Sequence, residues 1–227
     1  MDRTINYRGC KFELSEFFSE PLWNYFYNLQ SLIVYYDMTK ELVTKEIVAS
    51  SLYDNSSWLT PEEIVDLDEE FNADLHSIID GDVIDGDDWA HRKTFIPNMQ
   101  RNIVICMSLA LLEALLDGVC KEIEPNRSIG NKGSYIQERI SYLKKSKGFL
   151  CDKNTMKIFT VFSQIRNSFI HELKFSIPVE SVKFMNEKTG PFADLRQGLS
   201  FVHVELLLSS LVSFGEEFQS AYYNFDQ

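Results

Sequence analysis

The sequence predicts an all-α protein, an antiparallel helical bundle with an additional N-terminal helical region. Three observations favour this fold class. Apolar residues recur at helical spacing along most of the chain, 44% of the residues are apolar and can fill a core, and Pro and Gly fall between the periodic segments. We expect an acidic helical region over residues 1–88, packed on the bundle, and the bundle itself over residues 89–227.

Two helices are expected in the N-terminal region. The first covers residues 21 to about 52, because Pro21 suits the first helical position and the residues after it are apolar at helical spacing. The second begins at Thr60, which can cap a helix and is followed by Pro61 and, at the third position, by Glu63. We expect this second helix to end near Ile79.

Four helices are expected in the bundle. A long one runs from Trp89 to about Glu124, with Pro97 as a kink or break. Three more cover about 134–146, 154–175 and 199–222. The segment between the last two, residues 176–198, contains two Pro and two Gly, so we expect irregular structure there, with short extended pieces.

The acidic segment DGDVIDGDDW, residues 80–89, invites comparison with a calcium-binding loop. Asp80 and Asp82 match the first two ligand positions of an EF-hand. The sixth position, where the loop needs Gly, is Asp85, and the twelfth, where it needs Glu, is His91. We therefore expect a solvated acidic turn and no metal site.

Cysteine usage and hydropathy predict a cytoplasmic protein with reduced thiols. The four cysteines lack metal-binding spacing, and the first ten residues lack the apolar stretch of a signal peptide. The most apolar segment, residues 103–116, has 14 residues and contains Glu113, which makes it too short for a membrane span. We expect a buried core helix there, no membrane contact and no cofactor.

The net charge of −12 is unevenly distributed. Residues 1–88 contain 5 Lys or Arg against 20 Asp or Glu, a balance of −15. Residues 139–183 contain 9 Lys or Arg against 3 Asp or Glu, a balance of +6. Such an asymmetry predicts that one side of the protein faces a polyanion.

The stretch RNSFIHEL, residues 166–173, lies in this basic segment. On a helical projection Asn167 and His171 lie about 170° and 150° from the centre of the apolar face, and Arg166 lies on the flank, about 70° away. Thr160, Ser163 and Gln164 share the far, polar side. The apolar face, about 80° wide, is expected to be buried and consists of Ile158, Phe162, Ile165, Phe169 and Leu173.

These three polar residue types suit the cleavage of RNA, which carries its own nucleophile, the 2′-OH. An imidazole with a pKa near 6.5 transfers protons at neutral pH, and a guanidinium stabilises charge on the nonbridging phosphate oxygens. Asn167 would hold the imidazole or the phosphate in place. The simpler interpretation is a solvated helix face on which Arg166, Asn167 and His171 occur by accident. The expected chance number of Arg and His separated by four to six residues is about 0.4, and that of the stricter Arg-Asn-x3-His is about 0.01.

The Arg-Asn-x3-His pattern on a late helix of a helical bundle resembles the motif of the HEPN superfamily. The resemblance covers residues 89–222, and Glu113 within the apolar stretch SLALLEALLDG is similar to the long helix of several HEPN groups. It implies a metal-independent endoribonuclease of toxin–antitoxin or phage-defence type, with Arg166, Asn167 and His171 as catalytic residues. The expected products carry a 2′,3′-cyclic phosphate and a 5′-OH.

The resemblance also implies the partners. They are an RNA substrate, a second copy of the chain in a homodimer with a composite active site, and an antitoxin or regulatory protein. The family's toxins that pair with a nucleotidyltransferase antitoxin carry Tyr two residues after the His, whereas this chain has Leu173. The resemblance therefore does not extend to that mode of neutralisation.

Two alternatives to a nuclease stay open. The first is a non-catalytic protein-interaction module of HEPN-like fold. In the second, the acidic half mimics a nucleic acid and inhibits a protein that binds nucleic acid.

Overall fold

The structure is a computed structural model that describes residues 3–15, 19–55, 86–126, 135–172, 177–190 and 194–222. The side chains of residues 44–55, 86–96, 171, 172 and 197 lie outside this description. The chain divides into two compact units. The first contains residues 1–36 and 101–227, and the second contains residues 37–100.

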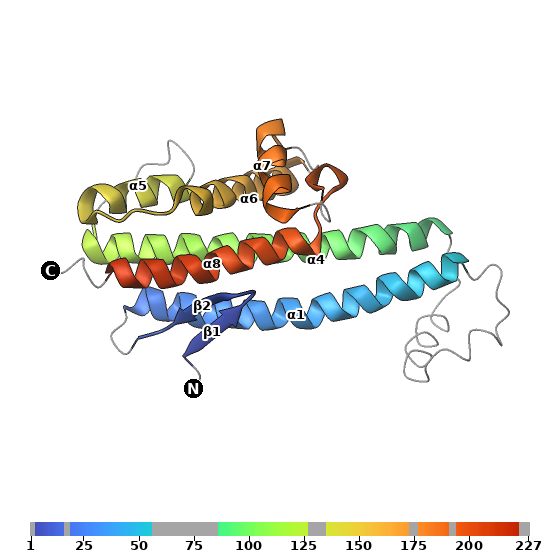
Figure 1. Ribbon diagram of the computed structural model, residues 1–227, viewed down its shortest axis with the longest axis horizontal. Coiled ribbons are helices and arrows are strands. Elements are labelled where there is room, and N and C mark those ends of the chain that lie inside the picture. Colours follow the sequence, from blue (N-terminus) through green and yellow to red (C-terminus); the bar gives the residue numbers. More distant parts are fainter. Residues whose placement is uncertain are drawn as a thin grey trace. The chain divides into compact units, whose positions relative to one another are not determined.

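The described residues form a predominantly helical fold with one small sheet, which confirms the helical fold class (Figure 1). The helices expected at 134–146, 154–175 and 199–222 are present with ends shifted by up to three residues. In chain order the elements are β1 (Thr4–Tyr7), β2 (Cys10–Glu13), α1 (Glu20–Asn55), α4 (Gly86–Ile123), α5 (Tyr135–Lys147), α6 (Lys153–Glu172), α7 (Val179–Thr189), a 3-10 turn (Leu195–Gln197) and α8 (Phe201–Tyr222).

The chain opens with an antiparallel β-hairpin, where the sequence analysis expected only helix. Its two-residue turn places Arg8 and Gly9 at φ values of 50° and 81°, a left-handed conformation that suits a tight hairpin turn. Ile5 and Tyr7 are buried while Asn6 between them is exposed, so β1 has the alternation of a half-buried strand. Each strand has only four residues, too few for the alternation to stand out in the sequence.

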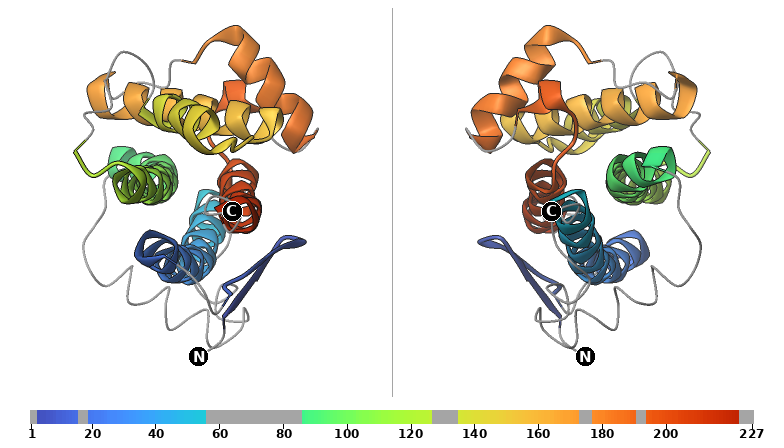
Figure 2. Two further views of the ribbon diagram at one scale, coloured as in Figure 1. Left: turned by 90° about the vertical axis from the view of Figure 1, so that its left-hand side faces the viewer. Right: turned by 90° about the vertical axis from the view of Figure 1, so that its right-hand side faces the viewer.

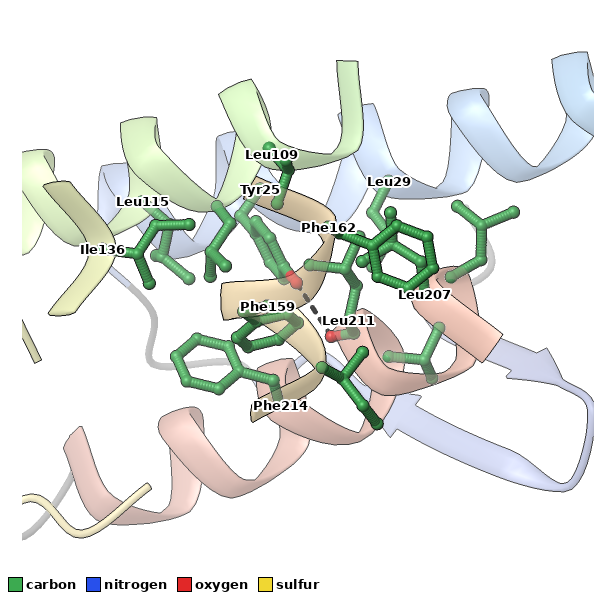
Figure 3. Close-up of a cluster of buried hydrophobic side chains, with 14 of the residues drawn as sticks. Tyr25, Leu29, Leu109, Leu115, Ile136, Phe159, Phe162, Leu207, Leu211 and Phe214 are labelled. Atoms are coloured by element: carbon green, nitrogen blue, oxygen red, sulfur yellow. Dashed lines mark hydrogen bonds between the residues drawn. The ribbon is translucent and has the colours of Figure 1, made fainter. Parts of the chain in front are cut away.

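The first unit has a core formed by its parts of α1 and α4 together with α6 and α8. Figure 2 shows α4 and α8 nearly end-on, with α6 lying across them. Figure 3 shows how side chains from these helices interlock around Phe159, Phe162 and Phe214. The buried Tyr25 hydroxyl donates a hydrogen bond of 2.8 Å to the Leu211 carbonyl oxygen, so α1 is joined to α8 by a polar contact inside the core.

The division into units differs from the expected boundary after residue 88. Residues 1–36 belong to the same unit as the bundle helices, because the hairpin and the start of α1 bury large side chains in the core. Phe12 is fully buried, and the backbone N–H of Glu13 donates to the Glu216 carboxylate of α8 at 2.8 Å. Composition alone had separated these residues from the bundle because the region is acidic.

The second unit contains the end of α1 and the beginning of α4. There the Gln100 side-chain amide donates to the Thr39 hydroxyl at 2.7 Å. α4 continues as one helix through Pro97, and it begins at Gly86, so residues 86–89 are helical where an acidic turn was expected. The helix expected at 60–79 lies outside the described residues, as do residues 80–85 of the acidic turn.

Helix Pro97–Ile123 is the one helix in the described part of the chain that is long and apolar enough to cross a membrane. The apolar segment from which the sequence predicts a core helix, residues 103–116, is shorter than this helix. Half of the most apolar window is buried inside the protein, as a core helix would be. Val104, Ile105 and Leu109 are fully buried, in agreement with the expected core helix.

Residues 176–198, expected to be irregular, contain helix α7 and a 3-10 turn. Pro178 immediately precedes α7 and its carbonyl accepts from the Ser181 N–H at 2.9 Å, so this Pro starts a helix. Met185 is fully buried, which gives α7 one face in the core. The short helix escaped notice because four Pro and Gly residues surround it.

A buried histidine caps the start of α8. The backbone N–H of Ser200, at the cap position, donates to Nδ1 of His203 at 2.9 Å, the part that Glu or Gln plays in a capping box. The His203 side chain is fully buried. Burial, together with the positive charge of Arg101, lowers the pKa of His203 to about 4 despite the opposing effect of Asp194.

This cap predicts a pH-dependent stability. Between pH 6.5 and about 4 the unfolded chain binds a proton at residue 203 and the folded chain does not, so the free energy of unfolding decreases as the pH falls. The expected slope from this residue is about 1.4 kcal/mol per pH unit. His203→Gln keeps a capping acceptor but cannot bind this proton. In denaturant unfolding, the wild type should therefore lose stability relative to His203→Gln as the pH falls through this range. Parallel pH profiles for the two proteins would contradict the buried neutral imidazole.

Candidate functional site

Helix α6 buries its apolar face as the sequence predicted. Ile158, Phe162 and Ile165 are buried, and Phe169 is partly exposed, while Leu173 lies outside the described residues. The Phe159 ring contacts the Phe214 ring of α8 with centroids 5.5 Å apart. Packing against α8 therefore sets the rotation of α6 and decides which of its residues face outward.

The polar side of α6 is less open than the sequence predicted. Ser163 is buried, with 8% of its surface exposed. The Thr160 hydroxyl accepts a hydrogen bond from Gln137 of α5 at 3.1 Å, and Gln164 accepts one from Ser181 of α7 at 2.9 Å. The expectation was wrong here because α5 and α7 cover this side of α6.

Arg166 is held by an ion pair between α6 and α4. Its Nη1 donates to Glu113 Oε1 at 2.8 Å, and the two side chains are 19% and 23% exposed. Its Nε donates at 3.4 Å to Oδ1 of the neighbouring Asn167, a longer and weaker contact. Of the five guanidinium N–H groups, three have no partner among the described residues. A fixed guanidinium with free N–H donors is suited to binding an oxyanion.

Asn167 is exposed, as expected from its position opposite the apolar face. α6 continues to Glu172, so the backbone of His171 lies one turn after Asn167 in the same helix. The side chain of His171 lies outside the described residues. The structure thus brings Arg166 and Asn167 together, and the position of the imidazole relative to them stays a prediction.

Glu113 is the residue at this site that the motif did not reveal. In the sequence it stands out as the charge inside the apolar segment 103–116 and as part of the HEPN resemblance, and in the structure it is the partner of Arg166. The signal was present, because a lone carboxylate in an apolar helix needs a cation or a hydrogen-bond donor beside it. Cys106 lies nearby on α4, where burial raises the pKa of its thiol against the opposing influence of Arg166.

Helix α4 also carries a strip of apolar residues, three of them exposed, around the position of Glu113. By helical geometry its members lie within about 60° of one another. Met107 is 47% exposed, which is high for a large apolar side chain. We call it the α4 strip; it consists of Ile103, Met107, Ala110 and Ala114.

A groove of about 450 Å³ lies between α1 and α4, and its lining includes Tyr25, Gly118 and Ala114, the last a member of the α4 strip. Neither Arg166 nor Asn167 lines it. Among the described residues, no cluster of three or more His, Cys, Asp or Glu side chains is arranged to hold a metal ion.

Comparison with protein-family models, with curated proteins and with solved structures finds no match to this chain.

The ion pair between Arg166 and Glu113 is expected to stabilise the packing of α6 on α4. A double-mutant cycle with Arg166→Ala and Glu113→Ala should give a coupling free energy of about 1 kcal/mol in denaturant unfolding. The pair Lys121–Asp117 lies within one helix, and its lysine is 69% exposed; it serves as the comparison and should give about 0.3–0.5 kcal/mol. A coupling near zero for Arg166 and Glu113 would contradict a fixed guanidinium.

Proposed function

We propose that this chain is a metal-independent endoribonuclease of HEPN type, with Arg166, Asn167 and His171 as its catalytic residues. The observation that supports this most is the Arg166 guanidinium, anchored by Glu113 and Asn167, with three N–H groups that no described residue accepts from. The proposal assigns that remaining capacity to a phosphate of RNA.

The proposed reaction needs no metal ion. Arg166 binds the nonbridging oxygens of the scissile phosphate and stabilises the charge that develops on them. One imidazole takes the proton of the 2′-OH, the oxygen attacks phosphorus, and the bond to the 5′ oxygen breaks as a second imidazole protonates that oxygen. The products are a 2′,3′-cyclic phosphate and a 5′-OH.

The second imidazole would come from another copy of the chain. The α4 strip is apolar, three of its four residues are exposed, and it lies on the helix that holds Glu113, the partner of Arg166, which suits a two-fold contact in which the same surface is used twice. Across such a contact the two motifs would share one cleft. We therefore include a homodimer with a composite site in the proposal.

The basic segment is compatible with RNA in spite of the acidic total. Exposed Lys144, Lys145 and Lys153 have no carboxylate within 4.0 Å in the part of the chain that the structure describes. By contrast, Arg8, Lys11, Lys121, Arg139 and Arg196 all form ion pairs. The unpaired lysines are available to phosphates, and binding should weaken as the salt concentration rises.

By resemblance, the biological role would be that of a cytoplasmic toxin or phage-defence effector, restrained by an antitoxin or regulatory protein. The alternative is a non-catalytic interaction module of the same fold, which the α4 strip would equally serve as a contact for a protein partner. The two differ in whether His171 is needed for any activity on RNA.

Cleavage of single-stranded RNA in EDTA is the test of the proposal. The wild type should release fragments with 2′,3′-cyclic phosphate and 5′-OH ends, and His171→Ala should lower the rate by about 10²–10⁴-fold because proton transfer is lost. Arg166→Ala should also lose the activity. His203→Gln is the matched control, since it alters a histidine in the core and should retain cleavage.

Circular dichroism would verify that each variant is folded. Cleavage that persists in His171→Ala, or that EDTA abolishes in the wild type, would contradict the proposed chemistry. A folded wild type without any effect on RNA would favour the interaction module.

The dimer is tested through the α4 strip. Met107→Glu places a charge at the centre of the strip, so the protein should become a monomer and lose cleavage together. Light scattering should report twice the chain mass of 26.4 kDa for the wild type and the chain mass for the variant. Leu150→Glu, at a residue 72% exposed between α5 and α6, is the control and should remain dimeric. A monomeric and fully active Met107→Glu would remove the composite site from the proposal.

A further inference from the structure

The junction of α6 and α7 carries an aromatic ring flanked by two cations from different helices. Nζ of Lys157 on α6 lies 5.5 Å from the centroid of the Phe184 ring on α7, and Nζ of Lys188 lies 5.7 Å from it. Phe184 is partly exposed, and both lysines are exposed. Neither lysine has a carboxylate within 4.0 Å in the described part of the chain.

Contacts between α6 and α7 hold this junction in a fixed arrangement. The hydrogen bond from Ser181 to Gln164 fixes the start of α7 on α6, and the buried Met185 anchors the helix one turn further on. The ring of Phe184 packs against the edge of the core and is therefore held in place. A positioned ring costs little conformational entropy when a planar ligand stacks on it.

The junction lies on the side of α6 that carries Asn167. By helical geometry Lys157 lies about 80° from Asn167, whereas Arg166 lies on the opposite flank, about 180° from Lys157. Ten residues separate Lys157 from Asn167, a distance of about 15 Å along the helix axis. A strand whose scissile phosphate binds at Arg166 would therefore cross the outer face of α6 past Asn167 and reach Phe184 a few nucleotides from the cut.

We propose that Phe184, Lys157 and Lys188 form a binding site for single-stranded RNA, in which one base stacks on the ring and the lysines contact its flanking phosphates. This inference rests on the proposed function. It adds the path that the RNA strand takes beyond the catalytic residues. Aromatic rings beside basic side chains are the usual means of binding single strands without sequence preference. A paired helix is excluded because its bases are not free to stack.

The acidic residues of α7 define the path of the strand. Glu180 and Glu187 are exposed, and by helical geometry they lie on the side of Phe184 away from Lys188. Phosphates would be repelled there and attracted toward Lys157. The strand therefore passes Phe184 on the side of Lys157 and α6, and does not cross the outer face of α7.

The test uses a fluorescent single-stranded 2′-O-methyl RNA, which lacks the attacking hydroxyl and so reports binding without cleavage. Phe184→Ala should raise the Kd from anisotropy by about five-fold to a hundred-fold, and Phe184→Leu, which preserves the packing, should do the same. Phe184→Trp should restore binding. In each of Lys157→Gln and Lys188→Gln the slope of log Kd against log salt should decrease by about 0.7.

Lys183→Gln is the matched control, since Lys183 is exposed on α7 like Lys188 but has no aromatic ring beside it within the described residues. It should leave Kd nearly unchanged. Equal effects from Lys183 and Lys157, or unchanged binding in folded Phe184→Leu, would overturn this site while leaving cleavage of unmodified RNA by the wild type intact. A wild type that neither binds this RNA nor cleaves RNA would overturn both proposals.

Discussion

Helix α8 carries more apolar surface than one neighbouring element can cover. The other elements of the first unit pack around it and bury this surface. Eleven of its 22 residues are buried, so cover is needed on several sides. The hairpin supplies Phe12, whose ring lies so close to Gly215 that a Cβ there would meet it at 2.7 Å. α1 supplies Tyr25, and the corner between α5 and α6 supplies Phe149, which packs on Phe218 with ring centroids 5.0 Å apart.

The candidate site is a consequence of that packing. Because the apolar face of α6 lies against α8, Asn167 must face outward and Arg166 falls on the flank next to α4. Glu113 then meets the guanidinium and orients it. A carboxylate beside an arginine competes with any anionic ligand for the guanidinium. It also holds the guanidinium in one orientation, so that less side-chain entropy is lost when a ligand binds. The site is therefore linked to the core through two helices rather than placed on a loop.

The arrangement of charge explains how an acidic protein can present a basic surface. The acidic residues outnumber the basic ones overall, yet several lysines of α5, α6 and α7 have no acidic partner in the described residues. Screening over about 8–10 Å limits how far distant carboxylates oppose them at physiological salt. Local pairing, and not the net charge, decides where a polyanion can bind. In the alternative in which the acidic half mimics a nucleic acid, the local arrangement of carboxylates would matter in the same way. Many of those carboxylates belong to residues 56–85, which lie outside the described residues.

The sequence by itself determined the helical class, the three helices after residue 134 and the buried face of α6, because these follow from periodicity within one segment. It also determined that Asn167 faces away from Ile158 and Phe162. Only the tertiary structure decided that Glu113 pairs with Arg166, that α5 and α7 cover part of the polar side of α6, and that the N-terminal hairpin belongs to the core. Each of these contacts joins segments far apart in the chain. A local sequence pattern does not predict which distant side chain will contact a given face of a helix.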